Sequence, residues 1–346
     1  MPPLTDDAIE SLRQREFPIT RDRVYLDYAT FGPLPASHVR AAEEALERGA
    51  RRASSGLNGS TLLESVREEA AALLHSPSRN VCLLTSTSEG MGLLAAGLDW
   101  RAGDEVIVLS HEFEGCVAPF LALRDVTLRV AEVADEIPEL VGDRTRAVSL
   151  SVVDRTTGAR APVEAIAAAC RKRDAWLALD AAQAMGALDL DAAASGADVV
   201  SAHGYKFLLS GFGLAPTFCS DRALEELRVP RPGWKNAAVG HDSAARFEPT
   251  MSSIPGLAGT LESLRLLNSF PAEERESRAL AAAHSLAHGL DATPVTSTIV
   301  SVPHSAELLE RLRQRGVVAA AVDDRLRLST HFFTTQEDVD RVLDAL

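Results

Sequence analysis

The chain has 346 residues, of which 46% are hydrophobic and 24% are charged, as is typical of a soluble globular protein large enough for two domains. Its formal net charge of −14 argues against nucleic acid or an anionic membrane as a partner, because no positive field would attract a polyanion. The apolar stretches are too short to span a bilayer, and residues 1–17 lack the apolar core of a signal peptide. Together with four scattered cysteines, these features predict a cytoplasmic protein with reduced, mostly buried thiols.

Residues 80–218 alternate short apolar runs with segments of helical periodicity. This alternation predicts an α/β fold with a mostly parallel sheet covered by helices on both faces. One of the connecting segments, DLDAAASGA (189–197), is expected to be a helix. The expected strands are VCLLT (81–85), EVIVL (105–109), VTLRVAEV (126–133), RAVSLSVV (146–153), WLALD (176–180), DVVSA (198–202) and LAPTFC (214–219).

The pattern changes near residue 255, where longer helical segments alternate with the strands STIVSVP and RLRLS. We therefore expect a large domain over residues 25–255 and a small C-terminal α/β domain over residues 256–346. Residues 1–24 look helical and are expected to pack with the small domain.

Polar residues that follow these strands define the candidate site, because ligands of open parallel sheets bind beyond the carboxyl ends of the strands. Thr87 and Ser88 open a helix after the first strand, and a helix start with hydroxyl groups binds phosphate. The alternative is an ordinary helix cap. Asp180 ends an apolar strand, where a carboxylate needs a partner, although a cap or a turn would also account for it.

Lys206 is one of only three lysines, the others being Lys172 and Lys235. It follows an apolar strand 26 residues after Asp180, so both can lie at the same sheet edge. A partly desolvated lysine has a lowered pKa and reacts with carbonyl groups, whereas the alternative is a side chain that extends to solvent. A phosphate site, a carboxylate for a ring nitrogen and a reactive lysine together describe pyridoxal 5′-phosphate (PLP).

The chain also resembles the class V aminotransferases, PLP-dependent enzymes of fold type I that include cysteine desulfurases, kynureninases and isopenicillin-N-epimerase-like proteins. The resemblance implies a seven-stranded sheet between helices, a small C-terminal domain and a homodimer. It rests on YLDYATFGPLP (25–35), TSTSEG (85–90), HEFEGCVAPF (111–120), SVVDRTTGARAP (151–162), LDAAQAMG (179–186), SAHGYKFL (201–208), RFEPT (246–250) and RLRLSTHFFTTQEDVDRVL (325–343).

The matched positions imply roles for individual residues. Lys206 forms the Schiff base, Asp180 pairs with the pyridinium nitrogen, and Arg327 binds the substrate carboxylate. Thr250 or Ser252 reaches the phosphate of the neighbouring subunit. The other implied cofactor contacts are Thr87, Ser88, Phe113, Gln183, His203 and Tyr205.

Several positions depart from the family pattern. Tyr205 replaces the usual histidine before the lysine, and Arg155 replaces an asparagine or serine that contacts the cofactor. Either Phe113 or Glu114 occupies the position that stacks on the cofactor ring. No cysteine follows residue 219, which counts against a desulfurase that uses a cysteine persulfide.

We therefore expect a PLP-dependent enzyme that acts on an amino acid through an external aldimine and a Cα carbanion. An aminotransferase is the first expectation, and a C–S lyase or an amino-acid epimerase is the alternative. A non-catalytic binding protein with the same fold is the alternative of another class. We expect no metal, since His284 and His288, four residues apart on a helical segment, have no third ligand nearby.

Overall fold

A seven-stranded sheet forms the centre of the molecule in the computed structural model, which describes residues 4–52, 59–237, 239–292, 295–303 and 306–345. The strand order is β2-β8-β7-β6-β5-β3-β4, and β8 runs opposite to the other six strands of this sheet. This arrangement confirms the predicted mostly parallel sheet. The strands are β2 (Val81–Leu84), β3 (Glu105–Leu109), β4 (Thr127–Ala131), β5 (Thr145–Ser151), β6 (Trp176–Asp180), β7 (Val199–Ser201) and β8 (Ala215–Cys219).

The central strands are apolar throughout because both faces of the sheet are covered. In β6, Leu177 and Leu179 belong to the core on one face, while Trp176 and Ala178 belong to the core on the other. This alternation follows from the two-residue period of a strand. Helices that cover or flank the sheet are α4 (Thr87–Gly97), α5 (Glu114–Leu121), α6 (Ile137–Leu140), α7 (Val163–Lys172) and α8 (Asp221–Glu226).

The predicted helix over residues 189–197 is wrong, since this segment forms only turns. The Asp191 carboxylate accepts a hydrogen bond from the Ala194 amide at 2.8 Å, and the Ser195 hydroxyl donates to the Ala192 carbonyl at 2.7 Å. Gly196 then adopts a left-handed conformation with φ of +76°. Local side-chain bonds and this glycine end the segment after about one turn.

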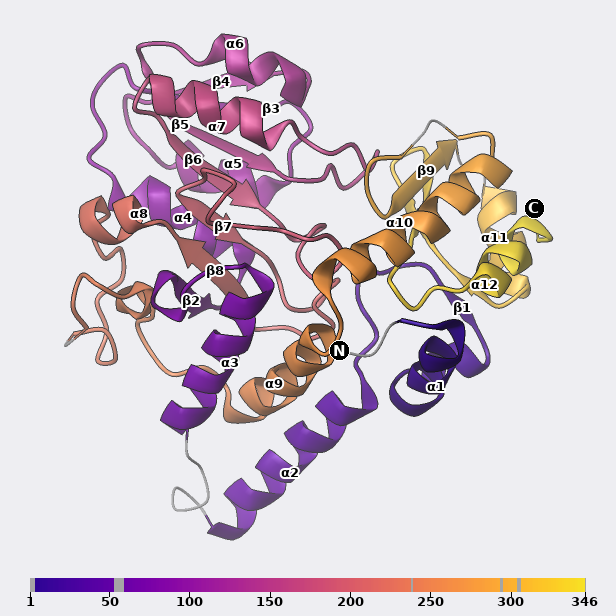
Figure 1. Ribbon diagram of the computed structural model, residues 1–346. Coiled ribbons are helices and arrows are strands. Elements are labelled where there is room, and N and C mark those ends of the chain that lie inside the picture. Colours follow the sequence, from indigo (N-terminus) through magenta and orange to yellow (C-terminus); the bar gives the residue numbers. More distant parts are fainter. Residues whose placement is uncertain (1–3, 53–58, 238, 293–294, 304–305, 346) are drawn as a thin grey trace.

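Three helices form a layer below the sheet, α2 (Ala36–Arg52), α3 (Gly59–Leu73) and α9 (Ile254–Asn268). Figure 1 shows α2 projecting from the lower end of the molecule, and α9 packs against both of the other helices. Ring nitrogen Nδ1 of His38 in α2 lies 2.9 Å from the hydroxyl of Ser263 in α9. Asn268 donates to the Glu69 carboxylate at 2.7 Å and so joins α9 to α3.

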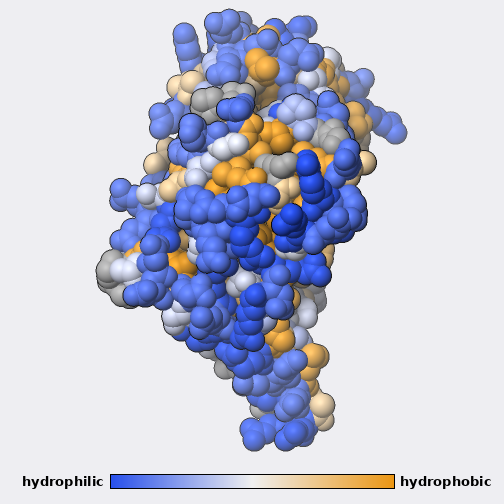
Figure 2. Space-filling view, turned by 90° about the vertical axis from the view of Figure 1, so that its right-hand side faces the viewer, coloured by the Kyte–Doolittle hydropathy of each residue, from blue (hydrophilic) through white to orange (hydrophobic). Residues whose placement is uncertain are grey.

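The C-terminal unit has its own sheet and its own apolar core. Its antiparallel strands have the order β11-β12-β9, and the helices α10, α11 and α12 pack with them (right-hand side of Figure 1). Figure 2 shows that the face on this side is largely hydrophilic. The elements are α10 (Ala272–Gly289), β9 (Ile299–Pro303), α11 (Ala306–Gln314), β11 (Ala320–Val322), β12 (Arg325–Ser329) and α12 (Gln336–Leu343).

The N-terminal segment contacts the C-terminal unit. Arg13 in α1 (Asp6–Glu16) forms two hydrogen bonds with the Asp338 carboxylate, and the Phe17 ring stacks on Phe333 with centroids 4.0 Å apart. Strand β1 (Val24–Tyr25) pairs in parallel with β10 (Val317–Val318). Short 3-10 turns complete the elements, η1 (Pro18–Arg21), η3 (Ser78–Asn80), η4 (Ala134–Glu136) and η5 (Ala244–Phe247).

The four cysteines are free thiols and all are buried, as the sequence predicted. Among the described helices, none combines the length and the apolar character needed to cross a membrane.

Candidate active site

The candidate site lies where three neighbouring parallel strands end. Ser151, Asp180 and Ser201 are register partners at the carboxyl ends of β5, β6 and β7. Strand β2 runs parallel to β7, so helix α4 also begins at this edge. Residues that are distant in the sequence are thus gathered at one edge, as expected for a ligand site in this kind of sheet.

The Lys206 segment is seated by close backbone packing. The Gly32 amide donates to the Tyr205 carbonyl at 2.7 Å. A β-carbon on Gly32 would lie 2.1 Å from the Lys206 carbonyl oxygen, and one on Gly186, whose φ is +95°, would lie 2.4 Å from the Phe207 carbonyl oxygen. Only glycine allows these approaches, so the two glycines help to set the position of the Lys206 backbone in the site.

Charged groups of both signs surround the Lys206 amine. Burial lowers its pKa, Asp180 opposes that shift, and Arg327 and Arg155 reinforce it. Asp180 is only 4% exposed, and burial raises the pKa of its carboxyl group to about 6 although Lys206 acts in the opposite direction. The Asp180 carboxylate accepts from the Ala182 amide at 2.7 Å and faces the Cys116 thiol at 3.8 Å.

Two aromatic rings lie beside the lysine. The Lys206 amine is 5.8 Å from the ring centroid of Phe113 and 5.8 Å from that of Tyr205. Glu114 begins α5 and is exposed. Of the two candidates for the ring-stacking position, this geometry favours Phe113.

The start of α4 offers groups for an anion. Ser86 caps the helix by accepting from the Glu89 amide, and Ser88 is exposed in the first turn. The Thr87 amide lies 3.4 Å from Nδ1 of His203. Burial, reinforced by Lys206, lowers the pKa of His203 to about 4, so the imidazole is neutral at physiological pH and Nδ1 can accept this bond.

Arg327 comes from β12 of the C-terminal unit and is 5% exposed. Its guanidinium donates to the Arg155 carbonyl at 2.9 Å and to the Thr30 hydroxyl at 2.5 Å, and it lies 3.7 Å from the Asp27 carboxylate. Gln183 donates its amide to the carbonyl of Ala29 in the same entry segment at 3.1 Å. Residues 27–30 therefore connect Arg327 with the strand ends.

Polar atoms without hydrogen-bond partners remain buried in this region. They are Thr87 Oγ1, Gln183 Oε1, Arg155 Nε and Arg327 Nε, each unpaired within the part of the chain that the structure describes. A buried polar atom is costly unless it is paired, so these atoms indicate a polar ligand. A helix start for phosphate, a buried carboxylate for a ring nitrogen and an amine for an aldehyde fit PLP.

The other two lysines and Thr250 lie elsewhere. Lys172 is exposed at the end of α7, and Lys235 pairs with the buried Glu248. Thr250 is exposed and accepts a hydrogen bond from the Trp234 indole at 3.2 Å, so within one chain it is not gathered with the other predicted site residues.

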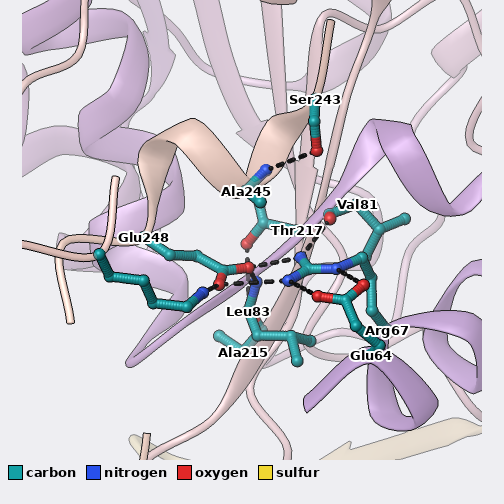
Figure 3. Close-up of polar contacts among 10 residues, drawn as sticks. Glu64, Arg67, Val81, Leu83, Ala215, Thr217, Ser243, Ala245 and Glu248 are labelled. Atoms are coloured by element: carbon teal, nitrogen blue, oxygen red, sulfur yellow. Dashed lines mark hydrogen bonds and ion pairs between the residues drawn. The ribbon is translucent and has the colours of Figure 1, made fainter. Parts of the chain in front are cut away.

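Glu248 belongs to a buried ionic cluster at the sheet edge (Figure 3). Its carboxylate pairs with Arg67 and accepts from the Leu83 amide at 2.8 Å, while Arg67 donates to the Val81 carbonyl at 2.7 Å. Because β2 is an edge strand, these side chains satisfy backbone groups that a further strand would otherwise bind.

Four neighbours of the site were not predicted from the sequence. Asp27 and Thr30 hold Arg327, Cys116 faces Asp180, and Glu112 accepts from the Ser151 hydroxyl at 2.5 Å. A carboxylate directly after a short apolar run is the signal that marks Asp27. No group of three potential metal ligands is found among the described residues, and His284 contacts the Val295 carbonyl at 3.1 Å.

Comparison with known proteins identifies relatives of one family. The class V aminotransferase family model matches residues 24–309. A probable cysteine desulfurase of Methanothermobacter thermautotrophicus is 30% identical over 277 residues, which cover 74% of this chain and 69% of that protein. A kynureninase of Deinococcus radiodurans is 31% identical over 272 residues, which cover 73% of this chain and 65% of that protein.

Solved structures share the fold. The cystine C–S lyase C-DES, in complex with its reaction product cysteine persulfide, has a TM-score of 0.87 and 23% identity. The match covers 95% of this chain and 98% of that one. A mutant of C-DES with glycine covalently linked to its PLP cofactor has a TM-score of 0.88 and 22% identity, covering 96% of this chain and 98% of that one.

Proposed function

Because the chain belongs to the class V aminotransferase family, whose enzymes depend on PLP, we propose that it is a PLP-dependent enzyme that removes the Cα proton of an amino-acid substrate. The observation that carries the proposal is the Lys206 amine beside the Phe113 ring at the strand ends, where the charges of Asp180 and Arg327 both act on its pKa. Family membership itself confirms the resemblance found in the sequence.

The residues that would hold PLP follow from the fit of the site. Lys206 would bind its aldehyde, Asp180 its ring nitrogen, and Thr87 and Ser88 its phosphate. Phe113 would pack against the ring, with Gln183, His203 and Tyr205 as further contacts. When bound, PLP supplies an electron sink that stabilises negative charge at Cα.

The chain's own residues bind the substrate and move protons. Arg327 binds the α-carboxylate and so orients the substrate relative to Lys206. The Lys206 amine, with its lowered pKa, accepts the Cα proton as a general base and returns it as a general acid. Asp180 favours a positive charge at the ring nitrogen because its buried carboxylate gains a partner.

Among the outcomes of Cα proton removal, we propose cleavage of a C–S bond at Cβ as a candidate beside transamination. The likeness to a desulfurase and to a C–S lyase supports it. The four cysteines are buried, so none offers an exposed thiol to take up sulfur. Sulfur would therefore leave with the bonding electron pair and a proton, without passing through a cysteine of this chain.

The two candidate reactions differ in their need for a second substrate. A lyase forms keto acid without an added acceptor, whereas an aminotransferase requires an acceptor keto acid.

Borohydride reduction tests the cofactor assignment. We expect the purified protein to be yellow, and reduction to bleach it and leave a pyridoxyl group on Lys206 that peptide mass spectrometry detects. Lys206→Ala should abolish the adduct, because the reacting amine is gone. Lys172→Ala, a change at an exposed lysine, should leave it intact. A protein that takes up no PLP, or an adduct on Lys235, would contradict the proposal.

A further inference from the structure

Three consecutive backbone carbonyls hold the segment that carries the reactive amine. The Tyr205 carbonyl accepts from the Gly32 amide at 2.7 Å, and the Lys206 carbonyl accepts from an amide of its own turn at 3.0 Å. The next carbonyl, that of Phe207, lies 3.0 Å from ring nitrogen Nε2 of His331. This third contact comes from the C-terminal unit, so that unit touches the backbone directly beside the lysine.

The hydrogen bonds of His331 define its tautomer. The Phe332 amide lies 3.0 Å from Nδ1, and because an amide nitrogen only donates, Nδ1 must be the acceptor. The proton of the neutral ring is therefore on Nε2, which donates to the Phe207 carbonyl. Burial lowers the pKa of His331 to about 3, the bond to Phe207 opposes that shift and Arg275 adds to it, so the ring is neutral at physiological pH.

A second contact of the C-terminal unit supports the same carbonyl. Arg275 in α10 donates to the Gly186 carbonyl at 3.0 Å. Gly186 in turn lies against Phe207, since a β-carbon on this glycine would be 2.4 Å from the Phe207 carbonyl oxygen. The His331 ring is fully buried and lies beside Tyr28, with centroids 5.2 Å apart. The partners of this ring are thus supplied by the protein itself.

The segment that contains His331 also carries the arginine of the candidate site. Arg327 lies in β12, and His331 follows two residues after the end of that strand. The Thr334 hydroxyl accepts from the His331 amide at 2.9 Å and so fixes the backbone at this point. One short segment therefore joins the proposed carboxylate-binding group to the backbone of the reactive lysine.

We propose that His331 is a positioning residue, whose Nε2–H holds the Phe207 carbonyl and so sets the place of the Lys206 amine relative to the cofactor aldehyde and to Arg327. This inference rests on the proposed function and adds a residue that acts through the backbone. Position matters because a displacement of about 1 Å can slow a reaction between bound groups by about 100-fold.

The test measures how fast the full-length apoprotein attaches PLP. Stopped-flow absorbance at increasing PLP concentration gives a maximum rate, which reports the condensation of the Lys206 amine with the aldehyde and the release of water. It also gives a half-saturating concentration, which reports docking of the cofactor. His331→Asn lacks a donor at the place of Nε2, so we expect the maximum rate to fall by about 10- to 100-fold and half-saturation to stay unchanged. His331→Gln carries an amide donor near that place and should retain most of the rate.

A histidine elsewhere in the C-terminal unit provides the matched control. Nε2 of His284 also lies near a backbone carbonyl, that of Val295 at 3.1 Å, but this side chain is exposed on α10. His284→Asn should therefore change neither the maximum rate nor half-saturation. Equal maximum rates for His331→Asn and His331→Gln would overturn the inference, whether both are slow or both are unchanged. An unmodified protein that forms no adduct on Lys206 would overturn the proposed function as well.

A measurement on the unmodified protein decides the matter if the variants fail to fold. Nitrogen NMR of protein with isotope-labelled histidine should show His331 as the neutral Nε2–H tautomer at neutral pH. The Nε2 resonance should shift when PLP is attached, because the bond to the Phe207 carbonyl connects the ring with the lysine segment. A neutral Nδ1–H tautomer, or an Nε2 resonance that PLP leaves in place, would overturn the inference.

Discussion

The protonation state of Lys206 is set by a small number of neighbouring charges. Burial and the two guanidinium groups of Arg155 and Arg327 favour the neutral amine, and Asp180 favours the charged one. Only the neutral amine adds to an aldehyde. Under the proposed function Lys206 binds the aldehyde of PLP, and its pKa would then govern the pH at which the apoprotein takes up the cofactor.

We expect the rate of PLP uptake by the apoprotein to rise with pH and to level off below pH 10.5, the ordinary pKa of lysine, because the pKa of Lys206 is lowered. Arg155→Gln removes a nearby positive charge and should move this plateau to higher pH. Asp180→Asn removes the negative charge and should move it to lower pH. Stopped-flow absorbance measures the profile. Shifts in the opposite directions would contradict this electrostatic account of the site.

At the scale of elements, the sequence predicted the strands with continuous apolar runs but not a turn held by local side-chain hydrogen bonds. Apolar runs such as 105–109 and 176–180 identified the strands, because buried parallel strands are apolar on both faces. The turn at 189–197 was mistaken for a helix, since hydrogen bonds of Asp191 and Ser195 are not visible in an apolar pattern. Asp180 and Lys206 were predicted as site residues because each follows an apolar strand and the 26-residue separation allows both to lie at the same sheet edge. Arg327 was found by family resemblance alone, because its β12 position shows no link to the large sheet.

The cluster of Arg67 and Glu248 connects α3, the edge strand β2 and the segment before Thr250. Both residues are only 2% exposed. Glu248→Ala would leave the buried Arg67 with only the exposed Glu64 as an ionic partner and would remove the partner of Lys235, so we expect the free energy of unfolding to fall by about 3 kcal/mol. Urea denaturation followed by circular dichroism measures this loss.

A matched control uses an exposed ion pair of the same kind. Glu262 pairs with Arg265 on the surface of α9, where such a pair contributes about 0–1 kcal/mol. Glu262→Ala should therefore change the unfolding midpoint little. Equal effects of the two substitutions would show that the buried cluster does not stabilise the edge strand.

For the whole molecule, we expect a homodimer. The Phe212 ring is 73% exposed although it stacks on Tyr205, next to Lys206, with centroids 4.3 Å apart. The family resemblance implies the homodimer, and this exposed aromatic ring beside the site is a candidate for its contact surface. Light scattering during size-exclusion chromatography should give twice the mass of one chain. Phe212→Asp should shift the distribution towards the monomer, since a charge would be buried in the contact. A single-chain mass at every concentration would rule out the dimer.

The pairing of β1 with β10 has a consequence for biosynthesis. Strand β1 leaves the ribosome about 290 residues before its partner, an interval of about 15 to 60 s at ordinary rates of translation. Arg327 emerges in the same late stretch. The nascent chain can form its central sheet before β10 emerges, so Arg327 can join the candidate site only after all seven strands of that sheet have been synthesised.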